Sequence, residues 1–171
     1  MKWQNHIVIA GVITATIDPV LAPGAMLGAI APDWLEWLIT PVRKVRHRTV
    51  THYLVLWLAA VLFFFLIWDF HHLGQAFSLG GLFHLLTDAM TISGIPLGWW
   101  SDRKFYLFGG RLKTGSAEEY MISGVVLAIC ALIVWHRPDN RFTPFFFDWG
   151  GYYEQGLIDG REWKENRFRW L

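Results

Sequence analysis

The sequence predicts an all-α integral membrane protein, a bundle of about five to six helices of which two or three cross the bilayer. Hydrophobic residues make up 54% of the 171-residue chain and charged residues only 17%, whereas soluble domains average about 25% charged residues. The eleven Trp and thirteen Phe residues exceed what a small soluble core can bury. A bilayer accommodates them, because apolar side chains can face lipid and aromatic rings can lie at the headgroup level.

The composition also limits the cofactors and partners. The formal net charge is only +1, so no basic excess suggests binding to nucleic acid. The single cysteine, Cys130, lies inside an apolar run, which excludes disulfides and thiolate metal sites. Any metal ion would therefore be held by His, Asp and Glu.

The first two predicted helices are short. Residues 7–17 form an apolar run that ends at Asp18-Pro19, and without a convincing cleavage signal we expect a retained helix rather than a signal peptide. Residues 24–38 are rich in small residues that suit close helix packing, with a break expected near Pro32. Because each piece is shorter than the roughly 20 residues of a spanning helix, we expect a short antiparallel hairpin that is partly embedded.

Three further apolar segments follow, at residues 53–68, 76–90 and 121–135. Basic loops at 43–48 and 103–113 flank them, and the positive-inside rule puts both loops in the cytoplasm. The first two segments then cross the membrane and return. The third leaves the C-terminal tail on the far side, unless that segment is re-entrant.

The chain divides into a membrane-embedded domain, residues 1–138, and a C-terminal tail, residues 139–171. The tail mixes aromatic residues with acids and bases, so we expect an element that binds a protein partner. An interfacial amphipathic helix explains the same pattern equally well.

Two motifs carry candidate metal ligands. The first is His47-Arg48-Thr49-Val50-Thr51-His52, which joins a basic loop to a predicted spanning helix. The second is His84-Leu85-Leu86-Thr87-Asp88, in which a spacing of four places the His and Asp on one helical face. Imidazole and carboxylate groups together suit zinc, manganese or iron.

The predicted topology brings other polar residues to the same membrane level. Helices that begin and end there carry His6, Asp33, His47, His52, His84 and Asp88. A helix cap or interfacial anchor would explain His6 alone, and a structural His–Asp pair between helices would explain His84 and Asp88. Glu118 and Glu119 could supply a general base or a further ligand, although acids are common in the first turn of a helix.

These motifs, in this order, resemble those of a bacterial family of inner-membrane-associated metal-dependent hydrolases, which is named for a LexA-regulated member. The resemblance covers roughly residues 3–136. It rests on Gly28-x3-Pro32-Asp33, His47-Arg48-x2-Thr51-His52, His84-x3-Asp88-x2-Thr91-x2-Gly94-Ile95-Pro96-Leu97 and the segment from Lys113 to Glu119.

The resemblance implies that the residues of the metal site are His6, Asp33, His47, His52, His84 and Asp88. Glu118 or Glu119 would be additions, and the implied cofactor is a divalent metal ion, with Zn²⁺ preferred. One departure concerns the family's Asp-x-Asp-His run. Here Leu35 cannot ligate and Glu36 stands in the histidine place, which puts a second metal ion in doubt.

We therefore expect a metal-dependent hydrolase in the bacterial inner membrane, acting at its cytoplasmic face on an ester or phosphoester of a lipid or other membrane-proximal substrate. The metal would lower the pKa of bound water towards 7, Asp33 or Glu118 would take its proton, and Arg48 would hold an anionic oxygen of the substrate. Two alternatives are a non-enzymatic membrane assembly or scaffold subunit with a structural His/Asp cluster, and an ion or proton transporter.

Overall fold

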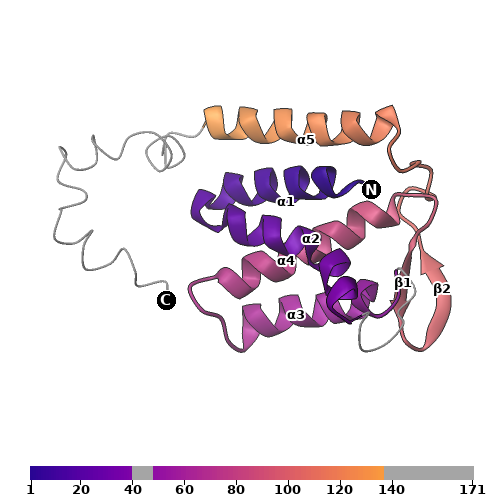
Figure 1. Ribbon diagram of the computed structural model, residues 1–171. Helices are drawn as coiled ribbons and strands as arrows, with labels where there is room; N and C mark the ends of the chain where they lie inside the picture. Colours follow the sequence, from indigo (N-terminus) through magenta and orange to yellow (C-terminus); the bar gives the residue numbers. More distant parts are fainter. Residues whose placement is uncertain (40–47, 137–171) are drawn as a thin grey trace, which may run out of the picture.

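The computed structural model describes residues 1–39 and 48–136, which form a helical bundle with a small two-stranded sheet across one end (Figure 1). The helices are α1 (Trp3–Ile17), α2 (Ala22–Ile39), α3 (Leu54–Leu66), α4 (Leu73–Ala89) and α5 (Ala117–Trp135), and the strands are β1 (Ile95–Gly98) and β2 (Ser101–Phe105). Single turns of 3-10 helix lie at Pro19–Leu21 and Val50–His52. The predicted all-α class agrees with this architecture apart from the hairpin.

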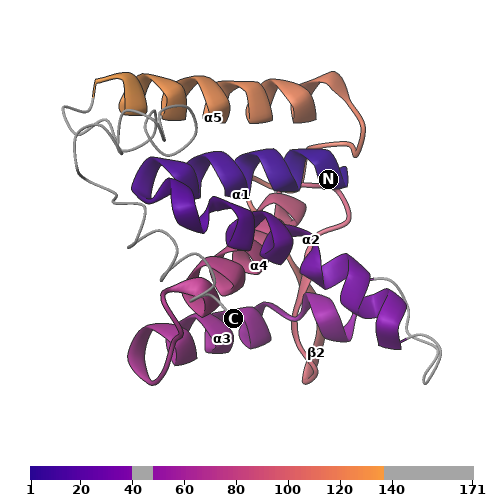
Figure 2. The same ribbon diagram turned by 60° about the vertical axis from the view of Figure 1, so that its left-hand side comes forward.

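The helices form a stack in which α1, α2 and α4 lie between two outer helices. In Figures 1 and 2, α5 lies beside α1 on one side and α3 lies below α4 on the other. Among the described residues, one cluster of buried apolar side chains consists of Ala31, Trp57, Leu85, Ala89 and Ile95. Partly buried aromatic and leucine side chains from α2, α3, α4 and the sheet pack around it.

Close packing of α2 on α4 depends on two glycines. A Cβ atom on Gly28 would lie 1.9 Å from the backbone oxygen of Phe77, and one on Gly80 would lie 2.0 Å from the backbone oxygen of Ala25. No side chain fits at either position, so the two backbones touch, as small residues allow in membrane helices. This contact brings the C-terminal parts of α2 and α4 together.

The break predicted near Pro32 is absent, because α2 continues through this residue to Ile39. Proline removes one helical hydrogen bond, but Pro32 is buried and Ala31 beside it belongs to the core. Tertiary packing of α2 therefore outweighs the local preference of proline. As a result Asp33 and Glu36 lie on one continuous helix.

The segment after α4 folds back as a β-hairpin, whereas the sequence indicated a basic loop over residues 103–113. Ile95 pairs with Phe105 and Gly98 with Ser101, so Trp99 and Trp100 form the turn. The Leu107 amide then donates to the Ala89 carbonyl, at 2.8 Å. The hairpin is thereby fixed to the end of α4.

Among the described residues, α5 is the one helix that is long and apolar enough to cross a membrane, and few of its residues are buried in the protein. Helix α3 is apolar but shorter. The predicted number of two or three crossings stays a prediction, as does the separate role of residues 139–171, which lie outside the described residues.

Candidate metal centre

Five of the predicted ligand residues meet at the end of the bundle where α1 begins and α4 ends. His6 comes from α1, Asp33 from α2, His52 from the 3-10 turn, and both His84 and Asp88 from α4. All of them are buried except Asp33, whose side chain is 41% exposed. The cluster is thus open to its surroundings on the side of Asp33. His47 lies outside the described residues.

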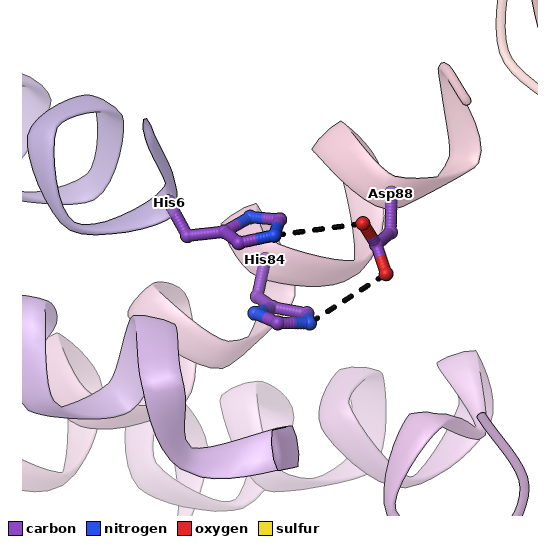
Figure 3. A group of neighbouring side chains, drawn as sticks. All are labelled: His6, His84 and Asp88. Carbon is purple, nitrogen blue, oxygen red and sulfur yellow. Dashed lines mark ion pairs between the residues drawn. The ribbon is translucent and has the colours of Figure 1, made fainter. Parts of the chain in front are cut away.

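The ring nitrogens and carboxylate oxygens lie at distances that suit a shared cation. His6 Nε2 is 3.5 Å from Asp88 Oδ1, and His84 Nε2 is 3.7 Å from Asp88 Oδ2 (Figure 3). His52 Nε2 is 3.4 Å from Asp33 Oδ1. Ligand atoms bound tetrahedrally to zinc at about 2.0–2.1 Å lie roughly 3.4 Å from one another. The separations in the cluster are therefore close to those of a tetrahedral site.

Two overlapping groups of three ligands result, and both include His84. One group is His6, His84 and Asp88, and the other is Asp33, His52 and His84; within each, the ligand atoms lie within 4.8 Å of one another. The Nε2 atom of His84 has a single lone pair, so it can bind one ion only. The geometry thus favours a single ion, bound by His84 together with ligands from either group, over two independently bound ions.

The hydrogen bond of His84 fixes its tautomer. Nδ1 lies 2.7 Å from the backbone oxygen of Ala29. A carbonyl oxygen can only accept a hydrogen bond, so Nδ1 must carry the proton. In the neutral ring Nε2 then carries the lone pair, on the side facing the two aspartates.

The tautomer of His6 is likewise fixed by its hydrogen bond. Its Nδ1 lies 2.7 Å from Thr87 Oγ1, and that hydroxyl lies 2.9 Å from the helix carbonyls of Phe83 and His84. The one hydroxyl proton is used by a carbonyl, so Thr87 accepts from His6 Nδ1. The lone pair of His6 is therefore also on Nε2.

His52 is oriented by a carboxylate that is not among the predicted ligands. Its Nδ1 lies 3.1 Å from Glu36 Oε1 and 3.1 Å from Thr51 Oγ1. The same oxygen of Glu36 accepts from the Arg48 amide at 2.7 Å. At metal sites a carboxylate often accepts a hydrogen bond from the ring nitrogen that does not bind the metal, because this orients the ring and raises its basicity.

A divalent cation fits the residues present. The Nε2 atoms of His6 and His84 are buried and have no hydrogen-bond partner among the described residues. Burying an unsatisfied ring nitrogen costs about 1–3 kcal/mol, and a cation bound between the rings and the aspartates would remove that cost. Imidazole nitrogen with carboxylate oxygen is a donor set for zinc, manganese or iron.

Arg48 reaches the cluster as the partner of Asp88. Its Nη2 lies 2.9 Å from Asp88 Oδ2, and Nη1 lies 3.4 Å from Thr91 Oγ1. The amino group of Met1 contacts Asp88 Oδ1. The guanidinium predicted to hold an anionic substrate oxygen thus lies at the site, where it already neutralises one ligand.

Asp33 is suited to remain ionised. Burial raises the pKa of its carboxyl group, but the side-chain contact with His52 and the nearby imidazoles of His84 and His6 favour the ionised form more strongly, so that the pKa lies below the ordinary value. Asp33 therefore carries its negative charge at neutral pH.

The two acids at the start of α5 have different environments. The Glu118 side chain is exposed, whereas Glu119 is completely buried. Glu119 accepts hydrogen bonds from Asn5 Nδ2 and from the Gly115 amide, both at 2.5 Å, and also from the Lys2 amide. Glu119 thereby fastens α5 to α1, and the sequence did not indicate which of the two acids would do so.

Comparison with known proteins gives one finding. A model of the family described as "YdjM inner membrane protein" matches residues 1–147. No curated protein and no solved structure shows a match.

Proposed function

The chain belongs to the YdjM inner membrane protein family, and we propose that it is a membrane-bound, metal-dependent hydrolase of ester or phosphoester bonds in lipids or other membrane-proximal substrates. The observation that carries this proposal is the orientation of the three imidazoles. Each has an Nδ1 hydrogen-bond partner, and each Nε2 lies 3.4–3.9 Å from a carboxylate oxygen of Asp33 or Asp88.

The bound ion, Zn²⁺ in our proposal, would lower the pKa of a water molecule towards 7 and so supply a hydroxide nucleophile. His6, His84 and Asp88 would hold the ion at the buried side. Asp33 is ionised and partly exposed, so it can receive the proton of that water. Arg48 would stabilise the anionic oxygen of the substrate while it remains paired with Asp88.

The distribution of basic residues supports a cytoplasmic site in a multi-pass protein. The Lys and Arg residues of the described part are Lys2, Arg48, Arg103, Lys104, Arg111 and Lys113. All belong to the segments at the end of the bundle that holds the cluster, whereas the turns at the other end carry Asp18 and Asp69. With α5 as a spanning helix, the positive-inside rule directs this end to the cytoplasm.

Metal analysis of the purified protein tests the proposal. We expect one divalent ion per chain, lost in His84→Ala because His84 belongs to both ligand groups, and retained in the exposed control His136→Ala. A Co²⁺-loaded sample should show the visible absorption of a tetrahedral site, and hydrolysis of lipid ester or phosphoester substrates should require the ion. Wild-type protein without a stoichiometric ion would overturn the proposal.

The second candidate is a non-enzymatic assembly subunit with a structural His/Asp cluster. It is favoured by the contacts of Arg48 and the Met1 amino group, which already neutralise Asp88 without a metal ion. Co-purification of full-length protein and of a chain ending at residue 138 separates the two roles. A subunit loses its partner on truncation, whereas the hydrolase keeps its metal and its activity.

A further inference from the structure

Residues 92–113 form a cap across the end of the bundle that holds the His/Asp cluster. The cap contains the β1–β2 hairpin and the loop that returns to α4. In Figures 1 and 2 the strands run across the direction of the helices, beside the beginning of α3. If α5 crosses the bilayer, the hairpin lies roughly parallel to the membrane plane, at the level where α5 begins.

The cap exposes large aromatic side chains. Trp99 is 68% exposed, Trp100 59% and Phe108 80%. The two Trp rings meet edge to face with their centroids 4.8 Å apart. Trp100 also covers Gly98, where a Cβ atom would lie 2.4 Å from the indole ring. The aromatic tip is therefore held in place by its own contacts, which reduces the entropy that binding would cost.

Basic side chains are exposed on the same cap. Arg103, Lys104 and Arg111 are exposed on the cap, and Lys113 follows at its end. Lys104 Nζ donates to the Ser93 carbonyl at 2.9 Å, which holds its charge along the hairpin. Tryptophan prefers the headgroup level of a bilayer, and clustered Lys and Arg attract anionic lipids. Both features together match the surface of an anionic phospholipid layer.

The cap is rigidly joined to the candidate metal site. The Leu112 amide donates to the Met90 carbonyl at 3.1 Å, and Thr91 forms a bridge with Leu112. Asp88 lies in the preceding turn, and Thr91 Oγ1 donates to its carbonyl oxygen at 2.7 Å. The depth at which the cap lies in the membrane therefore sets the depth of the metal site.

We propose that residues 92–113 are a membrane-interface module that binds the headgroup layer of anionic phospholipids and holds the His/Asp site at that level. The inference rests on the proposed function in one respect, because it narrows the substrate to a phospholipid whose ester or phosphoester bond lies in the headgroup region. Binding of the cap to lipid is a separate property that does not need the metal ion.

Fluorescence quenching in the full-length protein tests the placement. Trp99→Cys in a Cys130→Ser background is labelled with bimane and reconstituted into vesicles of phosphatidylcholine and phosphatidylglycerol. We expect lipids brominated near the headgroup to remove most of the emission, and iodide in the water to remove little. Ile129→Cys, which is exposed in the middle of α5, serves as the control and should respond to lipids brominated deep in the chain. A label quenched by iodide and not by lipid overturns the proposal.

The charge requirement is tested with the same label. Brominated phosphatidylglycerol is titrated into phosphatidylcholine vesicles, and the lipid fraction for half-quenching is measured. Arg103→Gln and Arg111→Gln should each raise that fraction about fivefold, the factor that corresponds to a loss of about 1 kcal/mol per basic residue. An unchanged midpoint overturns the preference for anionic lipid. The metal content of each sample is measured in parallel, so that a cap in the interface without bound metal contradicts the proposed function alone.

Discussion

The imidazole rings of His6 and His84 are stacked, with their centroids 3.8 Å apart and their planes 20° from parallel. Two imidazolium ions would repel each other strongly at this distance, so the stack favours neutral rings. Neutral imidazole is also the form that binds metal ions. The Nε2 lone pairs of both rings therefore face Asp88. The hydrogen bonds at Nδ1 hold the rings in this orientation, so removing them tests the site.

Thr87→Val should weaken metal binding without removing a ligand. The hydroxyl of Thr87 accepts a hydrogen bond from His6 Nδ1 at 2.7 Å, and valine has the same shape without an acceptor. Loss of a group that orients a ligand typically reduces metal affinity about 10- to 100-fold. Competition with a chelating dye measures this, with Thr14→Val, a buried threonine on α1, as the control. Thr87→Ser should restore the affinity, and an unchanged affinity in Thr87→Val would contradict the assigned tautomer.

Glu36→Ala should loosen the orientation of the His52 ring and remove the hydrogen bond of the Arg48 amide. The Glu36 carboxylate lies at 3.1 Å from His52 Nδ1 and accepts from the Arg48 amide at 2.7 Å. We expect metal affinity to fall about 10- to 100-fold and the Arg48 amide to exchange its hydrogen faster. Glu36→Gln keeps an acceptor without the charge, so its effect should be intermediate. If Glu36→Gln and Glu36→Ala leave exchange and affinity unchanged, Glu36 has no positioning role.

The sequence predicted the meeting of His6, Asp33, His52, His84 and Asp88 because antiparallel helices return to the same level and a spacing of four fixes one helical face. It did not predict the hairpin at residues 95–105, whose strands are short and are stabilised by contacts with α3 and α4. It also did not distinguish Glu118 from Glu119. Neighbouring helical residues point about 100° apart, and only the packing of α5 on α1 decides which of them is buried.

Gly80→Ala should destabilise the fold and disturb the site through the backbone. A Cβ atom at this position would lie 2.0 Å from the Ala25 carbonyl oxygen, so α2 and α4 must separate. Overpacking costs about 1–3 kcal/mol, and contact with backbone leaves little room for relaxation. Thermal unfolding in detergent measures the change. Gly124→Ala is the matched control, since no atom of another described element lies within 4 Å of its Cβ position on α5, and it should be neutral or stabilise by up to about 1 kcal/mol. Equal stability of the two variants would contradict the close helix contact.

Glu118→Gln and Glu119→Gln should separate catalysis from attachment of the last helix. Glu119 is buried and accepts hydrogen bonds from Asn5 and the Gly115 amide at 2.5 Å. Loss of its charge should cost about 1–3 kcal/mol and make α5 easier to release from α1 by protease at the preceding loop. Glu118 is exposed, so its replacement should leave stability and protease resistance unchanged.

The activity of the Glu118→Gln variant then decides the predicted role of this residue as a general base. Because its side chain lies on the surface of α5 while Asp33 lies 3.4 Å from His52 Nε2, we expect hydrolysis to persist in Glu118→Gln and to be lost in Asp33→Asn. The reverse result would contradict the role of Asp33 as the proton acceptor and would assign that role to Glu118.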